Sequence, residues 1–152
     1  MITQTIAAIV LGLAAAANQS TVIGKPFRIS DSVKEYCGMA PKIMMCEQTM
    51  PLLAAMQAEA RDPRWAAPME ALIAKSMQVR GKEWVQIRAL ECRSIHCALQ
   101  YAVYLDDLDH DVDGSEELER LMEPLGGIVA PEINQGLGKP MMVSVLVWKK
   151  RS

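Results

Sequence analysis

The sequence predicts a small α+β domain in which two or three helices pack on a three-stranded antiparallel sheet that contains a disulfide-stapled hairpin. Three observations support this class. Apolar residues recur at helical spacing from Trp65 to Met77, two extended runs over 84–92 and 97–105 flank a four-residue turn, and residues 141–148 form a nearly continuous apolar run. A chain of 152 residues has room for one such domain with a buried core.

The first residues resemble an export signal. Residues 6–17 form an apolar run that is too short for a comfortable bilayer span, and the alanines at 15–17 offer a cleavage site. We therefore expect a signal peptide over 1–17, a periplasmic or secreted protein, and no membrane span after cleavage. The alternative is that the run stays uncleaved as an N-terminal anchor. Residues 18–34 lack periodicity, which predicts a flexible N-terminal arm or an edge segment, and a single α+β domain follows over 35–150.

Two helices are expected in the region that is rich in alanine and methionine, which begins at Pro41. Pro51 should separate them, because a proline inside a helix removes a backbone hydrogen bond and clashes with the preceding turn. Thr49 then becomes a candidate N-cap for the second helix.

A further helix is signalled by Asp62 and Pro63, a capping carboxylate followed by a ring whose φ is already helical. Pro68 allows either a separate turn over 62–67 or one bent helix, and we favour the separate turn. Gly81 should end this helix. The apolar stripe of this helix comprises Trp65, Met69, Leu72, Ile73 and Met77.

The runs over 84–92 and 97–105 predict a hairpin with Cys92 opposite Cys97. This register also places four further pairs of residues opposite each other: Leu90 and Leu99, Arg88 and Tyr101, Gln86 and Val103, and Trp84 and Leu105.

Cys37, Cys46, Cys92 and Cys97 make an even number of cysteines, which in an exported chain favours disulfide bonds with three possible connectivities. Pairing of nearest neighbours makes the shortest loops. The hairpin favours a bond between Cys92 and Cys97, because opposed Cβ atoms lie near the separation that a disulfide spans. The connectivity of Cys37 and Cys46 stays open.

The last third of the chain predicts a helix over 115–125 with Leu118, Leu121 and Met122 facing inward. Gly126 and Gly127 should end it, and the glycines and prolines up to Pro140 predict an irregular stretch. The final strand over 141–148 is apolar on both faces, which is typical of a central strand.

The acidic turn Asp109, Asp111, Asp113 and Gly114 matches the opening of a calcium loop. The twelfth position of that loop, which should be a bidentate glutamate, is Arg120. A cation there opposes calcium binding, so we interpret the turn as a solvated cap of the helix that follows and keep weak calcium binding as the alternative.

Sulfur and imidazole groups offer two other candidates. Cys92, His96 and Cys97 could take part in zinc binding, or His96 could activate a free Cys97 thiol, but both ideas require the disulfide to be absent. Soft copper could bind the methionines around Cys37 and Cys46, although methionine is also a common core filler. We favour the structural interpretation of both groups and expect no cofactor.

Charge excludes a nucleic-acid partner, since 16 basic and 18 acidic residues leave a net charge of -2 with no basic run of the kind such proteins carry. No complete catalytic constellation can be assembled from the sequence. We therefore expect no enzyme but an exported binding or envelope accessory module that acts on an unknown protein partner or forms a homodimer. The alternative is a weak metal-binding protein with calcium at the acidic turn or copper at the methionine and cysteine cluster.

Two short motifs in the middle of the chain resemble those of other proteins. The run from Asp62 to Glu70 reads DPRWAAPME, and the later run from Glu91 to Cys97 reads ECRSIHC. Together they resemble a set of uncharacterised exported bacterial proteins with a D-P-x-W-A helix start and an E-C-[RK]-[ST]-x-x-C segment. The resemblance implies export, a disulfide between Cys92 and Cys97 and a small mixed fold, and it carries no catalytic residue.

Overall fold

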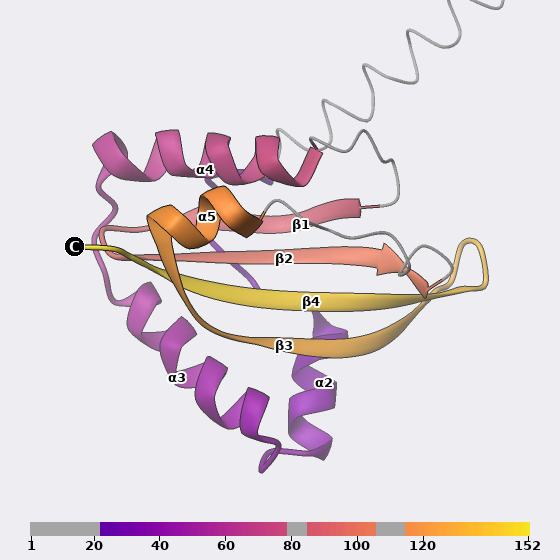
Figure 1. The fold of residues 1–152 in the computed structure, drawn as a ribbon. Helices are drawn as coiled ribbons and strands as arrows, with labels where there is room; N and C mark the ends of the chain where they lie inside the picture. Colours follow the sequence, from indigo (N-terminus) through magenta and orange to yellow (C-terminus); the bar gives the residue numbers. More distant parts are fainter. Residues whose placement is uncertain (1–21, 79–84, 106–114) are drawn as a thin grey trace, which may run out of the picture.

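A four-stranded antiparallel sheet forms the middle layer of the protein, with helices on both of its faces (Figure 1). The computed structural model describes residues 22–78, 85–105 and 115–152. The helices are α2 (Asp31–Met39), α3 (Met44–Gln57), α4 (Pro63–Gln78) and α5 (Ser115–Leu121). The strands are β1 (Val85–Cys92), β2 (His96–Tyr104), β3 (Met122–Asn134) and β4 (Lys139–Lys150), in the spatial order β1-β2-β4-β3.

The α+β class is confirmed, but the prediction of three strands and two or three helices is wrong. The described residues contain a fourth strand, β3, and a helix, α2, that the sequence did not signal. The leader over 1–17 and the helix stop at Gly81 lie outside the described residues. No described helix combines the length and hydrophobicity needed to cross a membrane.

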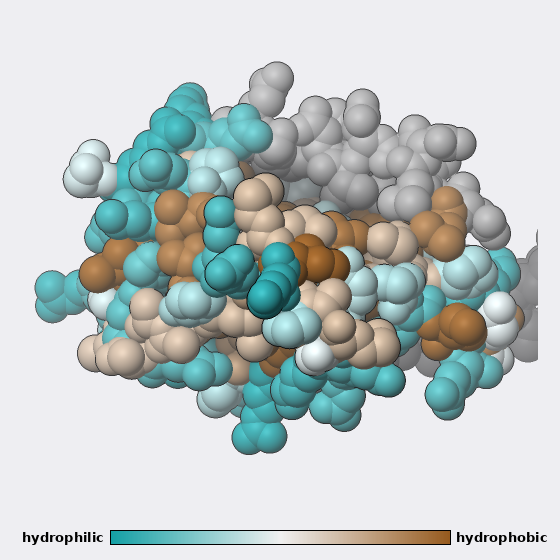
Figure 2. Space-filling view, turned by 90° about the horizontal axis from the view of Figure 1, so that it is seen from below, coloured by the Kyte–Doolittle hydropathy of each residue, from teal (hydrophilic) through white to brown (hydrophobic). Residues whose placement is uncertain are grey.

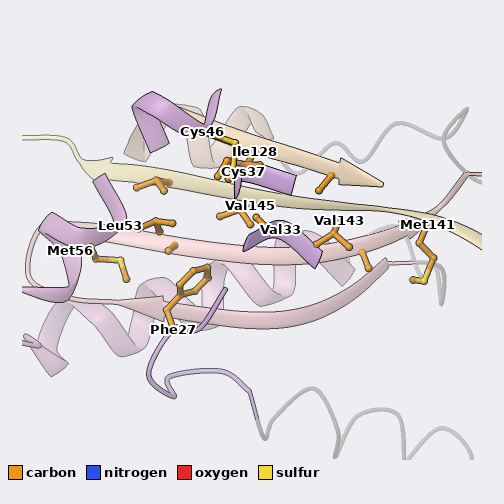
Figure 3. Packing of buried hydrophobic residues seen from close by; sticks show 14 residues of the cluster. Phe27, Val33, Cys37, Cys46, Leu53, Met56, Ile128, Met141, Val143 and Val145 are labelled. Carbon is orange, nitrogen blue, oxygen red and sulfur yellow. A yellow bond between two sulfur atoms is a disulfide. The ribbon is translucent and has the colours of Figure 1, made fainter. Parts of the chain in front are cut away.

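Strand β4 lies in the centre of the sheet, as its apolar sequence predicts. Its alternating residues Met141, Val143, Val145 and Val147 are buried toward α2 and α3. Figure 3 shows this cluster, in which Phe27, Val33, Leu53 and Met56 meet the strand residues and the disulfide between Cys37 and Cys46. Trp148 contributes to the opposite cluster.

The opposite cluster lies beneath α4 and α5. The predicted stripe of α4 packs there as a unit, with Ile73 fully buried and Trp65, Met69, Leu72 and Met77 partly buried against the cluster. From the 115–125 segment, Leu118 and Met122 are buried as predicted, whereas Leu121 is exposed. The helix ends at Leu121 because Met122 already pairs with Lys150 as the first residue of β3.

Strand β3 replaces the irregular stretch that its glycines and prolines predicted. It lies at the edge of the sheet, where a proline such as Pro131 is tolerated because one side of the strand has no hydrogen-bonding neighbour. A bulge between Pro124 and Gly126 absorbs the break in pairing, and Gly126 has a φ of 149°, which favours glycine. At Gly127, a Cβ would lie 2.7 Å from Leu146 Cδ2 and 2.8 Å from the carbonyl oxygen of Val145, so the close approach of β4 requires glycine.

The predicted hairpin forms, and its register is right only near the turn. Cys92 pairs with Cys97 and Leu90 with Leu99. A bulge between Ile87 and Ala89 then shifts the pairing by one residue, so the predicted pairs of Arg88 with Tyr101 and Gln86 with Val103 are wrong. The observed pairs beyond the bulge are Ile87 with Tyr101, Gln86 with Ala102 and Val85 with Val103. Trp84 lies outside the described residues.

The bulge has a clear effect on Arg88. Ile87 and Leu90 both face the cluster beneath α4, although strict alternation would put them on opposite faces. Arg88 is thereby turned to the other face, where its guanidinium reaches Glu132 and the sulfur of Met141.

Both predicted helix breaks are absent. Helix α3 runs through Pro51 and α4 runs through Pro68, so the separate turn over 62–67 is wrong and Thr49 is buried inside α3 instead of capping a helix. Packing of the helix faces on the sheet outweighs the single backbone hydrogen bond that each proline removes. The start signal at Asp62 is correct, since its carboxylate accepts a hydrogen bond from the backbone N–H of Arg64 at 3.0 Å.

The fold begins earlier than the predicted boundary at residue 35. Ile23 forms a parallel bridge with Leu90, and the N–H of Gly24 donates to the carbonyl of Leu90 at 2.8 Å, so part of the predicted arm is an edge segment beside β1. Phe27 and Val33 are buried in the core, and α2 begins at Asp31.

Two disulfides join nearest neighbours along the chain. Cys37 in α2 is bonded to Cys46 in α3, and Cys92 is bonded to Cys97 across the β1–β2 turn. All four cysteines are therefore oxidised.

Candidate functional site

Charged side chains gather around the turn that the Cys92–Cys97 disulfide closes. Arg61 and Glu70 form a double ion pair, with Nη1 to Oε1 at 2.6 Å and Nη2 to Oε2 at 2.8 Å. The same two side chains bind the backbone of Cys92, because Glu70 Oε1 accepts from its N–H at 2.8 Å and Arg61 Nη1 donates to its carbonyl at 3.1 Å. Helix α4 is thus fixed to the end of β1.

Glu59 and His96 form a second pair at this turn. His96 Nδ1 is hydrogen-bonded to Glu59 Oε1, and Glu59 Oε2 accepts from the backbone N–H groups of Ile95 at 3.0 Å and His96 at 3.1 Å. Burial by itself raises the pKa of Glu59, but the hydrogen bonds from His96 and the backbone outweigh it and hold that pKa below its ordinary range. Glu59 therefore acts as an ionised anchor for the turn.

Glu91 completes the network on the other face of β1. Its carboxylate is almost fully buried, accepts from the backbone N–H of Phe27 at 2.6 Å and pairs with Arg93 Nε at 2.6 Å. Arg93 also donates to the carbonyl of Glu59 at 3.2 Å. These contacts join the N-terminal segment, the segment before α4 and the hairpin turn, so Glu91, Arg93 and His96 of the ECRSIHC motif have a structural role.

A second polar region is an open hollow of about 610 Å³, which we call the groove. It lies between the start of α2, the bulged part of β1 and the β3–β4 turn. Its lining comprises Ser30, Asp31, Ser32, Glu35, Gln86, Arg88 and the 132–136 segment, with Ile133 as a 67% exposed apolar residue on the rim. The polar lining and open shape differ from the apolar, enclosed character of most small-molecule pockets.

The floor of the groove is held by Glu132. Both of its oxygens lie within 2.9 Å of Arg88 Nη1, and Oε2 also accepts from the Ser32 hydroxyl at 2.8 Å. Burial by itself raises the pKa of Glu132. The hydrogen bonds from Arg88 and Ser32 and the positive charge of Arg88 outweigh burial and hold that pKa below its ordinary range. The bulge in β1 is what brings Arg88 to this position.

The structure bears differently on the calcium, zinc, thiol and copper sites that the sequence suggested. Asp109, Asp111 and Asp113 lie outside the described residues, so the calcium hypothesis stays a prediction. The sulfur atoms of Cys92 and Cys97 are bonded to each other, which removes both the zinc thiolates and the free Cys97 nucleophile. The disulfide between Cys37 and Cys46 likewise removes the thiolate ligands from the proposed copper cluster.

Among the described residues, no group of three or more His, Cys, Asp and Glu side chains is arranged to hold a metal ion. The sequence did not reveal the residues that the structure brings together. Glu70 lies next to the apolar stripe of α4, and nothing in the local sequence indicates that it is buried and paired with Arg61. Arg88 lies in a run with the pattern of a regular strand, and the bulge that turns it toward Glu132 has no sequence signal.

The fold and site define a disulfide-bonded α+β protein with a polar surface groove. No protein-family model matches the chain, and no curated protein or solved structure is significantly similar to it.

Proposed function

We propose that this chain is an exported, non-catalytic binding module that holds a polar segment of a partner protein in the groove. The observation that carries the proposal is the contrast between two polar regions. The charged side chains around the hairpin turn are partly or fully buried and paired within the molecule. The groove is open: Arg88, Glu132 and Ser32 pair with one another at its floor, whereas the acidic and amide side chains of its walls are exposed, namely Asp31, Glu35 and Gln86.

The described reactive groups support a non-catalytic role. Catalysis by a thiol needs a free thiolate, and all four cysteines are in disulfides. His96 is tied to Glu59, whose second oxygen is occupied by two backbone N–H groups. This His–Glu pair therefore serves to hold the turn and does not activate a nucleophile at the hairpin.

Export is supported by the same disulfides, because such bonds persist in the oxidising compartments outside the cytosol. The apolar leader over 1–17 also supports localisation outside the cytosol.

The shape of the groove favours a chain segment over a small molecule. A partner segment can lie along an open polar surface and exchange hydrogen bonds with Ser30, Gln86 and the 134–136 turn, while Ile133 offers an apolar contact at the rim. The ion pair of Arg88 with Glu132 holds the floor of the groove in one arrangement, which lowers the cost of ordering on binding.

Site-specific photo-crosslinking in the exporting cell tests this function. A photoactivatable residue at Gln135 should give a discrete adduct with one protein, and the substitution Ile133→Asp should weaken that adduct. The matched control carries the same photoactivatable residue at Lys75, which is exposed on α4 and does not line the groove. Equal adducts at both positions, or none at Gln135, would overturn the groove as the binding site.

A further inference from the structure

Three cationic side chains lie at the end of the sheet opposite the groove. Lys149 and Lys150 end β4, and Arg151 follows them. All three are exposed, and none of them forms an ion pair with a carboxylate of the described residues. The arginines around the hairpin turn and in the groove, by contrast, are each paired with a glutamate. We call Lys149, Lys150 and Arg151 the basic end.

Backbone hydrogen bonds place two exposed aliphatic residues beside the basic end. The N–H of Lys150 donates to the carbonyl of Ile95 at 2.8 Å, and the N–H of Arg151 donates to the carbonyl of Leu121 at 3.4 Å. Ile95 is 43% exposed at the β1–β2 turn, and Leu121 is 38% exposed at the end of α5. Figure 1 shows these segments together at the left, and in Figure 2, which views the side of α2 and α3, the same end carries hydrophobic residues beside hydrophilic ones. Apolar and cationic groups therefore share one surface.

The net charge of this surface is positive. A hollow of about 470 Å³ at the basic end is lined by the three cations, by Glu123 and by Ser152. Glu123 lies opposite Lys149 in the pairing of β3 with β4, so it offsets one of the three charges. The exposed charges of α5 at this end, Glu119 and Arg120, offset each other. The remaining positive charge faces solvent.

The two lysines diverge, which decides the kind of ligand that fits. Successive residues of a strand point to opposite faces of the sheet. The ammonium of Lys150 lies 5.2 Å from the centroid of the Trp65 ring of α4. Lys149 extends from the other face, on which Val147 packs with the cluster beneath α2 and α3. A single small anion cannot meet both ammonium groups, whereas anionic groups spread over a plane can.

We infer that the basic end binds the surface of a membrane that contains anionic phospholipids, with the end of β4 directed toward the bilayer. The phosphate groups of such a surface are spread over a plane and attract lysine and arginine side chains. Ile95 and Leu121 lie beside the cations and can enter the apolar boundary beneath the headgroups. Trp65, half-buried near Lys150, is an aromatic residue of the kind enriched at this boundary. An acidic protein would also match the charge, but the exposed aliphatic side chains favour the membrane.

This inference goes beyond the proposed function and does not depend on it. The groove is lined by the end of β3 and the β3–β4 turn, whereas the basic end lies where β4 finishes. A membrane at the basic end therefore leaves the groove accessible to a partner. The crosslinking result at Gln135 and the binding to vesicles are separate measurements, and either can fail alone.

Flotation of vesicles tests the proposal directly. The purified, disulfide-intact protein is mixed with vesicles of equal parts phosphatidylglycerol and phosphatidylcholine, or with vesicles of phosphatidylcholine alone. It should float with the anionic vesicles only. Raising the salt concentration from about 0.1 M to about 1 M shortens the Debye length from about 10 Å to about 3 Å and should release the protein.

Two double substitutions with the same change in net charge make the test specific. Lys149→Gln with Arg151→Gln should weaken binding to anionic vesicles about 25-fold, since each cation near such a surface contributes about fivefold. Lys42→Gln with Lys75→Gln removes two exposed lysines outside the basic end and should bind like the wild type. Ile95→Asn should also weaken binding, because it removes an apolar contact without a change in charge.

Any one of three results would contradict the proposal. They are no flotation with anionic vesicles, equal binding to phosphatidylcholine alone, and equal losses in the two double variants. Retention on immobilised polyglutamate without flotation would assign the basic end to an acidic protein instead. The substituted side chains are all exposed, so a change in fold does not account for a loss of binding.

Discussion

Arg61 and Glu70 hold the backbone of Cys92 between them. The carboxylate accepts from the Cys92 N–H, the guanidinium donates to the Cys92 carbonyl, and the two side chains pair with each other through two contacts of 2.6 and 2.8 Å. The Glu70 side chain is 4% exposed and that of Arg61 is 32% exposed. This arrangement connects α4 to the disulfide-closed hairpin, and its removal should be costly.

The substitution Glu70→Ala should therefore lower the free energy of unfolding by about 3 kcal/mol, because it leaves a guanidinium and a buried backbone N–H without their acceptor. Urea denaturation measures this loss. The control is Asp31→Ala, which removes an exposed pair with Lys34 and should change stability by less than about 0.5 kcal/mol. Equal effects of both substitutions would contradict the structural role of Glu70.

Gly127→Ala tests the contact between β3 and β4. The added Cβ would meet Leu146 and the Val145 carbonyl at less than 3 Å, so the strands must shift and the free energy of unfolding should fall by about 2 kcal/mol. Gly38→Ala is the matched control, since nothing lies within 4 Å of its Cβ position in α2, and it should raise stability by about 0.5–1 kcal/mol. An unchanged free energy of unfolding in Gly127→Ala would contradict this close approach of β3 to β4.

Acid should destabilise the protein through Glu59 and Glu132. In the folded state, the pKa of each carboxyl lies below its ordinary value of 4.5, so the folded protein binds fewer protons than the unfolded chain in that range. Their contribution to stability is complete above about pH 4.5 and is lost as the pH falls through the lowered values. The free energy of unfolding, measured between pH 7 and pH 3, should decline over that window.

Glu59→Gln should flatten part of this decline, because the amide does not titrate. Glu119→Gln provides the comparison, since Glu119 is an exposed residue of α5, and its pH profile should follow that of the wild type. Identical slopes for Glu59→Gln and the wild type would exclude Glu59 as a source of the acid sensitivity.

A double substitution of Cys37 and Cys46 to serine should lower the free energy of unfolding by about 3 kcal/mol. The reason is that the unfolded chain regains conformational entropy when the loop is no longer closed. Thermal and urea unfolding of the purified protein measure the change. The fold should survive, because α3 also packs on the sheet through Leu53 and Met56. Complete unfolding of the double variant would show that the disulfide is required for the core itself.

Local sequence patterns were reliable where one chemical feature decides the structure. The carboxylate of Asp62 predicted the start of α4, the apolar stripe from Trp65 predicted its buried face, and the continuous apolar run predicted that β4 lies in the centre of the sheet. The pairing of Cys92 with Cys97 followed from the hairpin. Each of these signals acts over a few residues or one helix face, so no distant part of the chain had to be known.

Tertiary structure decided the rest. Pro51 and Pro68 lie within helices because the packing of whole helix faces outweighs a single lost hydrogen bond, and Pro131 lies in β3 because that strand happens to be at an edge. The bulge that turns Arg88 toward Glu132, and the groove that this pair floors, depend on strands far apart in sequence. Composition and periodicity are local properties, whereas the pairing of buried charges is a property of the assembled layers.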